Sequence, residues 1–259
     1  MIIALILALA IGLSLGLLGS GGSILTLPAL VYGAGVPEHD AVPMSLAVVG
    51  ATAAVGAVIQ AFKGWVDWRS AGLFAGGGAA GAIPGGLLSG YVPGAILMLS
   101  FAAIMVVVGI RMLRGPSAGS ARNVRARVGP ALVAGAGVGG LTAFLGAGGG
   151  FLVVPALERF LGLPLPKAMS TSLVVIAANC AMGLAVHAGS TRFDWPLTLT
   201  FGALAFVGMA AGISLARRLP LHGLRTAFGI FVLLMALFVL IQNRGFFVSG
   251  LALVAGPFA

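Results

Sequence analysis

Residues 18–30 read LGSGGSILTLPAL, and residues 145–157 read LGAGGGFLVVPAL. Glycine costs an α-helix about 1 kcal/mol and an interior proline about 3 kcal/mol, yet both copies carry these residues within hydrophobic sequence. The copies are 127 residues apart, and this offset holds without a gap well beyond the motif, with 26 identities in the 82 positions from Gly12 to Pro93. The chain therefore consists of two fused copies of one unit.

The repeat extends to residues that apolar sequence does not match by chance. At the same offset, Gly35 and Pro37 match Gly162 and Pro164, and the pair Asp67-Trp68 matches the pair Asp194-Trp195. We therefore expect one repeat over residues 1–115, a second over residues 128–259, and an Arg-rich linker over residues 116–127.

The composition is that of a protein embedded in lipid. Hydrophobic residues make up 60% of the chain and charged residues 7%, whereas soluble domains carry about 25% charged residues. Apolar runs of about 20 residues recur, the length that crosses a bilayer as a helix. Stretches such as residues 101–110, FAAIMVVVGI, lack the alternation of a β-barrel strand. The sequence predicts an all-α polytopic membrane protein.

Each unit contains three segments that we expect to be full spans, and a stretch before them that can be interpreted in two ways. The expected spans are residues 41–62, 70–90 and 94–113, followed by 168–188, 196–216 and 221–242. The preceding stretches, 1–36 and 128–163, carry the Gly-rich motif in the middle. One broken span in each would give eight crossings and two parallel copies. A hairpin in each would invert the second copy relative to the first.

The distribution of basic residues favours the hairpin, because Lys and Arg concentrate on the cytoplasmic side of a membrane protein. A broken span divides the 14 basic residues 9 to 5 between the two sides, and a hairpin divides them 12 to 2. We therefore expect two inverted-topology repeats, each a Gly-rich helical hairpin plus three transmembrane helices. Both termini would lie outside and the linker inside, in the cytoplasmic membrane. Whether the hairpins cross fully or are re-entrant stays open.

The hairpin gives the glycines a function at the turn. Backbone that reverses at membrane depth must have its polar groups satisfied by protein or by a water-filled cavity, and glycine reaches the positive φ angles of such turns. A helix starting after each turn would present free N–H groups to an anion, and Pro28 and Pro155 would fall near its first turn. Two such starts meeting mid-membrane would bind an anion without a buried Lys or Arg. The alternative is that the glycines only permit close helix packing.

Other polar residues in the spans can serve either structure or binding. Ser45 and the pair Thr171-Ser172 would lie at equivalent helix starts, where their hydroxyls could cap the helix or contact the substrate. Asn179 would lie mid-span and face the bundle interior, and Gln60 and His187 would lie near the interface. We expect the substrate-binding residues to be Gly19, Ser20, Gly21, Gly22, Ser23, Pro28, Ser45, Gly146, Gly148, Gly149, Gly150, Pro155, Thr171, Ser172 and Asn179.

Nothing in the chain suggests catalysis. There is one cysteine, and the three histidines lie in separate segments without an HExxH or GxSxG motif. We therefore expect no catalytic residues, no metal site and no cofactor. The net charge of +9 is explained by orientation in the bilayer, so we expect no nucleic-acid partner.

Two copies of L-G-x-G-G-x-x-x-x-P-A-L, each followed by G-x-P and by A-x-x-x-S-L, resemble the TauE/SafE family of sulfite and organosulfonate exporters. The resemblance covers essentially the whole chain. The second copy, KAMSTSL (167–173), is similar to that family's K-A-x-G-T-S-L segment, whereas the first, DAVPMSL (40–46), departs further. The resemblance implies a permease that exports small sulfur-containing anions such as sulfite or organosulfonates.

Two other functions are compatible with the sequence. A Gly-lined anion site can belong to a channel, and the protein could be a membrane scaffold without transport activity. The expected partners are a small anionic substrate and the lipid bilayer. The identity of the anion, the direction of transport, a coupling ion and the oligomeric state, a homo-oligomer included, are left open.

Overall fold

The computed structural model describes residues 2–18, 22–114, 128–145, 150–187, 193–216 and 221–242. Within these ranges the regular elements are all helical. The first repeat forms α1 (Ile2–Leu18), α2 (Ser23–Pro28), the π-helical turn η1 (Ala29–Gly33), α3 (Glu38–Phe62), α4 (Trp68–Ser89) and α5 (Gly94–Leu113). The second repeat forms α6 (Val128–Leu145), α7 (Gly150–Leu161), α8 (Leu165–His187), α9 (Trp195–Ala216) and α10 (Leu221–Gln242).

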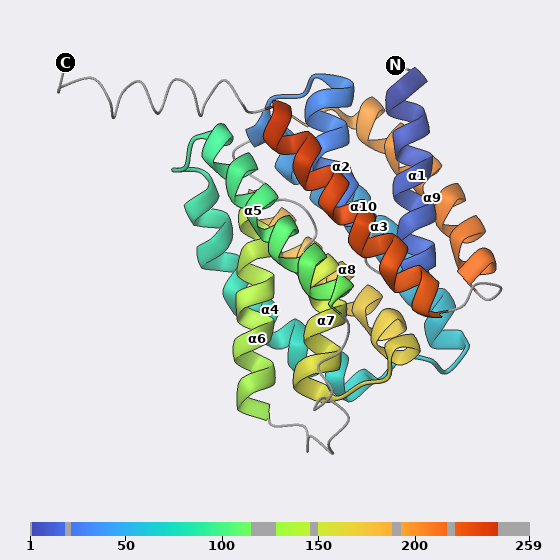
Figure 1. Ribbon diagram of the computed structural model, residues 1–259. Helices are drawn as coiled ribbons and strands as arrows, with labels where there is room; N and C mark the ends of the chain where they lie inside the picture. The colour runs from blue at the N-terminus through green and yellow to red at the C-terminus, as the bar shows by residue number, and fades with distance from the viewer. Residues whose placement is uncertain are drawn as a thin grey trace.

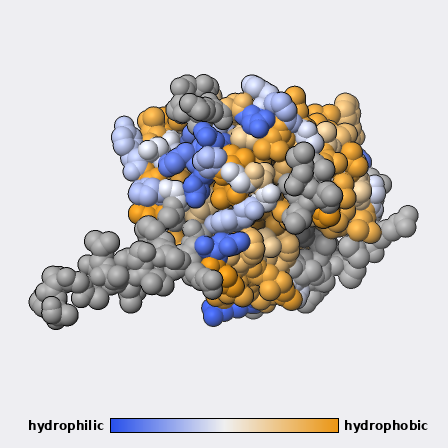
Figure 2. Space-filling view, turned by 90° about the horizontal axis from the view of Figure 1, so that it is seen from above, coloured by the Kyte–Doolittle hydropathy of each residue, from blue (hydrophilic) through white to orange (hydrophobic). Residues whose placement is uncertain are grey.

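The all-helical membrane fold expected from the sequence is confirmed. Five of the described helices, α3, α4, α6, α8 and α9, are long and apolar enough to cross a membrane. Large hydrophobic side chains are exposed on the sides of the bundle, among them Val58, Leu199 and Leu234, each more than half exposed. Figure 2, which looks onto the end where α1 begins, shows hydrophilic residues gathered across that end and hydrophobic residues around them.

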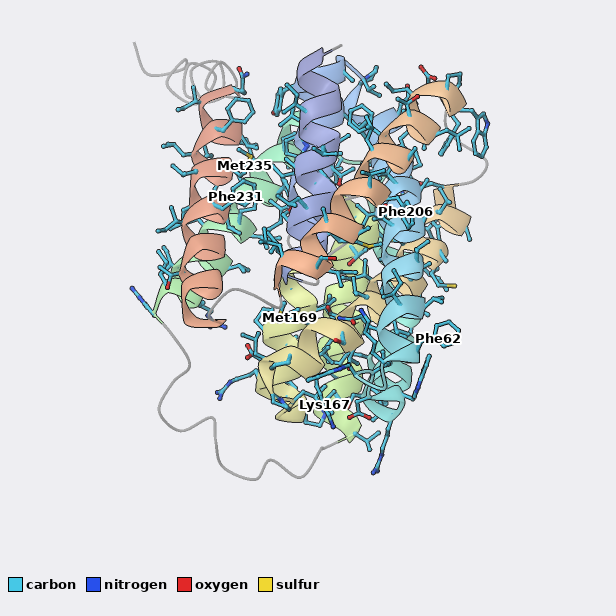
Figure 3. The ribbon with its side chains drawn as sticks, turned by 90° about the vertical axis from the view of Figure 1, so that its right-hand side faces the viewer. Phe62, Lys167, Met169, Phe206, Phe231 and Met235 are labelled. Atoms are coloured by element: carbon cyan, nitrogen blue, oxygen red, sulfur yellow. The ribbon has the colours of Figure 1, made fainter. Side chains whose placement is uncertain are left out.

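The helices of the two repeats pack in reciprocal pairs (Figure 1). The first helix of each repeat lies against the fourth of the other, so α1 packs on α9 and α6 packs on α4. The central helices α3 and α8 pack on each other. The last helices, α5 and α10, also form a pair, which lies beside the other helices in Figure 3, where Phe231 and Met235 mark α10.

The paired equivalent helices run antiparallel. A side chain at Gly50 of α3 would meet Cys180 of α8, and one at Gly56 would meet Leu173, so residue numbers rise along one helix as they fall along the other. The same relation holds in the α5–α10 pair, where Gly109 faces Leu233 and Gly229 faces Leu113. In these two pairs, α3 with α8 and α5 with α10, the equivalent helices therefore point in opposite directions.

The pairs made by first and fourth helices run parallel and pack through rows of small residues. In α4, Gly77, Gly81 and Gly85 lie directly against the backbone of Leu132, Ala136 and Gly140 in α6. Gly12 and Gly16 of α1 make the same kind of approach to α9. Without a hydrophobic driving force in lipid, such close backbone packing is what holds helices together.

Candidate functional site

Each Gly-rich motif lies between the end of one described helix and the start of the next. Helix α1 ends at Leu18 and α2 begins at Ser23, and α6 ends at Leu145 and α7 begins at Gly150. The helices that start after the two breaks, α2 and α7, contact each other. Six of the expected substrate-binding residues lie at the breaks, outside the described residues: Gly19, Ser20, Gly21, Gly146, Gly148 and Gly149.

Gly22 differs from the expectation that motif glycines provide positive φ angles. Its φ is −66°, in the right-handed helical region, and a Cβ there would strike the carbonyl oxygen of Ile11 and the side chain of Leu15 in α1. Gly22 is therefore a packing position of the hairpin. Among the described residues, positive φ angles are found at Gly35 (72°), Gly64 (69°) and Gly162 (65°), and Gly35 and Gly162 follow the returning helices of the two repeats.

The two prolines lie deeper in their helices than expected. Pro28 is the last residue of the six-residue α2, and Pro155 is the sixth residue of α7. Because α2 begins at Ser23 and α7 at Gly150, the missing proline N–H falls in the second turn and not in the first. In the first repeat the helix widens immediately afterwards into η1, and irregular turns of this kind are often found at functional sites.

Of the two roles that the sequence leaves open for Ser45, Thr171 and Ser172, the structure contradicts helix capping. Helices α3 and α8 begin at Glu38 and Leu165, so Ser45, Thr171 and Ser172 lie about two turns inside them. The Ser172 hydroxyl donates to the carbonyl of Met169 at 2.7 Å. The Thr171 hydroxyl accepts a hydrogen bond from the backbone N–H of Asp67 at 3.0 Å.

The bundle interior holds two polar side chains with unused hydrogen-bonding atoms. Among the described residues, the buried side-chain oxygen and nitrogen atoms without a partner are Oγ of Ser45 and both Oδ1 and Nδ2 of Asn179. Both residues are completely buried. Leaving a buried polar group unpaired costs about 1–3 kcal/mol, so each of these atoms calls for a partner such as an ordered water or a bound molecule.

Asn179 lies in a space that the neighbouring helix leaves open for it. A Cβ at Gly78 of α4 would overlap the Asn179 amide group. Ser45 lies on α3, which packs antiparallel on the α8 helix that carries Asn179. The other nearby hydroxyls are already engaged, since Thr52 donates to the Val48 carbonyl and Thr26 to the Gly22 carbonyl. Ser23 is buried as well.

The polar residues near the span ends make different hydrogen bonds, some within their own helix and some to another helix. Asp194 caps α9, because its carboxylate accepts from the Leu197 N–H at 3.0 Å, whereas the Asp67 carboxylate accepts from the Ser70 hydroxyl. His187 is the last residue of α8, near the span end as expected, and its buried ring lies 2.9 Å from the Ser89 hydroxyl. Gln60 reaches across to α8 and donates to the Ser170 hydroxyl at 3.1 Å.

Sequence reasoning missed the Gln60–Ser170 and Asp67–Thr171 contacts and the role of Gly78. The contacts join positions more than 100 residues apart, which no local pattern reveals. A signal was nevertheless present, because the segment 40–46 differs from its repeat equivalent 167–173 at the positions that make these bonds.

A helical chain with long apolar segments, exposed hydrophobic sides and few polar side chains in its interior is a multi-pass membrane protein. The chain matches the family model described as "Sulfite exporter TauE/SafE" over residues 4–239. The chain belongs to this family, and it is a membrane transporter of the TauE/SafE type.

Two relatives cover most of the chain. A "Probable membrane transporter protein" of Xylella fastidiosa (strain 9a5c) is 35% identical over 237 residues, covering 89% of this chain and 91% of the relative. A protein of the same description from strain Temecula1 / ATCC 700964 is 34% identical over the same lengths. No solved structure gives a significant match.

Proposed function

We propose that the protein exports small sulfur-containing anions, such as sulfite or organosulfonates, across the cytoplasmic membrane. The anion would bind between the two Gly-rich hairpins, near the membrane centre. The observation that carries the proposal is the pair of buried, unpartnered groups on the central helices: the amide of Asn179 and the hydroxyl of Ser45. The family's description as sulfite exporters supports the substrate class.

The charge distribution suits an anion held by neutral groups. The Lys and Arg side chains whose burial is described are all exposed: Lys63, Arg69, Arg111, Arg114, Arg159 and Lys167. A site in the interior would then use the Asn179 N–H groups, the Ser45 hydroxyl and the free N–H groups at the start of α7. Neutral donors bind an anion less tightly than a buried cation does, which favours release on the other side.

The opposed directions of equivalent helices support an inverted-topology transporter. With α3 antiparallel to α8, and α5 to α10, the two repeats would be related by an axis in the membrane plane. Folds of this kind place their substrate at the repeat interface and expose it alternately to each side. The contact between α2 and α7 brings the two broken segments to that interface.

Binding of oxyanions to the purified protein tests the proposal. We expect sulfite or a small sulfonate to bind, and Asn179→Ala and Ser45→Ala to weaken binding about tenfold or more, since each removes a donor to a charged ligand. Thr200→Val is the matched control, because the Thr200 hydroxyl bonds only locally, to the Pro196 carbonyl, on an exposed face. Unchanged affinity in both site variants would contradict the proposed site.

Flux through proteoliposomes tests transport itself. A carrier shows saturation and counterflow of the anion, whereas a channel passes ions without counterflow. We expect counterflow in the wild-type protein and its loss in the Asn179→Ala variant. An anion flux that is linear in concentration and unchanged by Asn179→Ala would favour a channel at another site.

A further inference from the structure

The two repeats form equivalent corners at opposite ends of the molecule. The upper corner, near the start of α1 in Figure 1, consists of residues 34–44 packed near residues 193–197. The lower corner consists of the repeat equivalents, residues 161–171 and residues 66–70. Lys167, labelled at the lower end of the molecule in Figure 3, belongs to the lower corner. Each corner lies where a central helix begins beside the start of a fourth helix.

The lower corner is tied together by side-chain hydrogen bonds. The Asp67 backbone N–H donates to the Thr171 hydroxyl at 3.0 Å, and the Gln60 amide donates to the Ser170 hydroxyl at 3.1 Å. The Ser70 hydroxyl holds the Asp67 carboxylate at 2.8 Å. Thr171, Ser170 and Ser70 are 0%, 2% and 5% exposed. These bonds fasten the α3–α4 connection to α8.

The upper corner is open at the equivalent position. A surface pocket of about 470 Å³ lies there, lined by Ala34, Gly35, Val36, Pro37, Asp40, Met44, Phe193, Asp194 and Leu197. Met44, in the pocket wall, directly precedes Ser45, whose hydroxyl is unpartnered. In the lower corner the equivalent of Ala34 is Leu161, which is buried at 7% exposure.

The sequence prevents the upper corner from forming the same bonds. The positions equivalent to Ser170, Thr171 and Ser70 are Pro43, Met44 and Leu197. None of these side chains has a hydroxyl. The Asp194 carboxylate, equivalent to that of Asp67, caps α9 by accepting from the Leu197 N–H. The difference between the corners is therefore encoded in residue type.

We propose that the Gln60–Ser170 and Asp67–Thr171 hydrogen bonds form a lock that keeps the lower entrance to the substrate site closed while the upper entrance stands open. The lock rests on the proposed function, since it requires a site that is exposed to the two sides in turn. Access from below requires the lock to break. Because Pro43 and Met44 of the upper corner lack the hydroxyls that accept these bonds in the lower corner, the resting protein favours the state with the upper entrance open.

Cysteine labelling of the purified protein measures the two entrances separately. Ala34→Cys reports on the upper corner and Leu161→Cys on its lower equivalent, each in a Cys180→Ala background that removes the chain's single cysteine. We expect rapid maleimide labelling at position 34 and slow labelling at position 161. Ser170→Ala with Thr171→Val should raise the rate at position 161 about tenfold, which corresponds to about 1.4 kcal/mol, and lower the rate at position 34.

Placing the two hydroxyls of the lower corner in the upper corner tests whether they are sufficient to form a lock. Pro43→Ser with Met44→Thr gives the upper corner the hydroxyls of the lower one, and it should slow labelling at position 34 and speed it at position 161. Thr200→Val, which removes an exposed hydroxyl that bonds only within α9, is the control and should change neither rate. Gln60→Met removes a hydrogen-bond donor of the lock at a half-buried position. It replaces Ser170→Ala with Thr171→Val if that double variant does not fold.

Unchanged labelling at position 161 in a folded lock variant overturns the lock. The same result with normal anion counterflow overturns the lock alone and leaves the proposed function standing. Labelling that shifts as expected in a protein without any anion flux supports the lock and contradicts transport. The two proposals therefore fail by different results.

Discussion

At the scale of single residues, Asn179 and Ser45 carry the buried side-chain atoms that lack a hydrogen-bond partner within the described part of the chain. A protein interior ordinarily pairs its buried polar groups, and the neighbouring Thr52 and Ser172 do so with carbonyls of their own helices. The Asn179 amide lacks such a partner and fills the space left by the absent side chain of Gly78. An unpartnered amide in this position lowers stability, which is why we propose that Asn179 contributes to binding.

Gly78 gives a specific test of this arrangement. A methyl group at Gly78→Ala would overlap the Asn179 amide, so we expect the amide to rotate or shift and anion affinity to fall several-fold. Gly76→Ala is the matched control on the same helix, because its methyl group meets open space. Titration calorimetry on both variants measures the difference, and equal affinities would show that the Asn179 geometry is irrelevant to binding.

Several residue roles could not be predicted from the sequence. The pairing of Asp67 with Thr171 and of Gln60 with Ser170 depends on how α3, α4 and α8 come together, and periodicity within one helix carries no such information. The burial of Asn179 was predictable from its mid-span position. That its amide would lack a partner was not, because this depends on a glycine one hundred residues away.

At the scale of elements, the predicted helices agree closely with the structure. The expected span 41–62 corresponds to α3 at Glu38–Phe62, and 94–113 corresponds to α5 at Gly94–Leu113. Long apolar runs bounded by prolines and Asp-Trp pairs fix these limits in the sequence itself. Helix α3 begins at Glu38, before the expected Ala41, because the Pro37 carbonyl accepts the Ala41 N–H. This earlier start places Ser45 inside the helix, where it does not cap the helix end.

The α4–α6 interface is held by direct backbone contact at glycines, and this predicts strong sensitivity to added volume. A methyl group at Gly81→Ala would overlap the backbone of Ala136, so we expect a loss of about 1–3 kcal/mol in stability from overpacking. Gly76→Ala, also in α4 but facing open space, should be neutral or stabilising. Thermal unfolding in detergent compares the two, and equal melting temperatures would contradict the tight interface.

At the scale of the whole molecule, the duplicated Gly-rich motif was the most informative feature of the sequence. It predicted two units and a break in each, and the structure has helix ends at Leu18 and Leu145 and new helices at Ser23 and Gly150. The orientation of one unit relative to the other in the membrane depends on how the whole chain assembles. The distribution of Lys and Arg predicted only that the two orientations are opposite. The reciprocal pairing of α1 with α9 and α4 with α6 required the structure.

The inverted arrangement of the two repeats is the central claim, because a shared site between opposed hairpins depends on it. Sided labelling of single cysteines in intact cells tests it most directly, with Glu38→Cys at the start of α3 and Ser120→Cys in the Arg-rich linker, both in the Cys180→Ala background. We expect an impermeant maleimide to label position 38 from outside and position 120 only after the membrane is opened. Labelling of both positions from the same face would contradict the account.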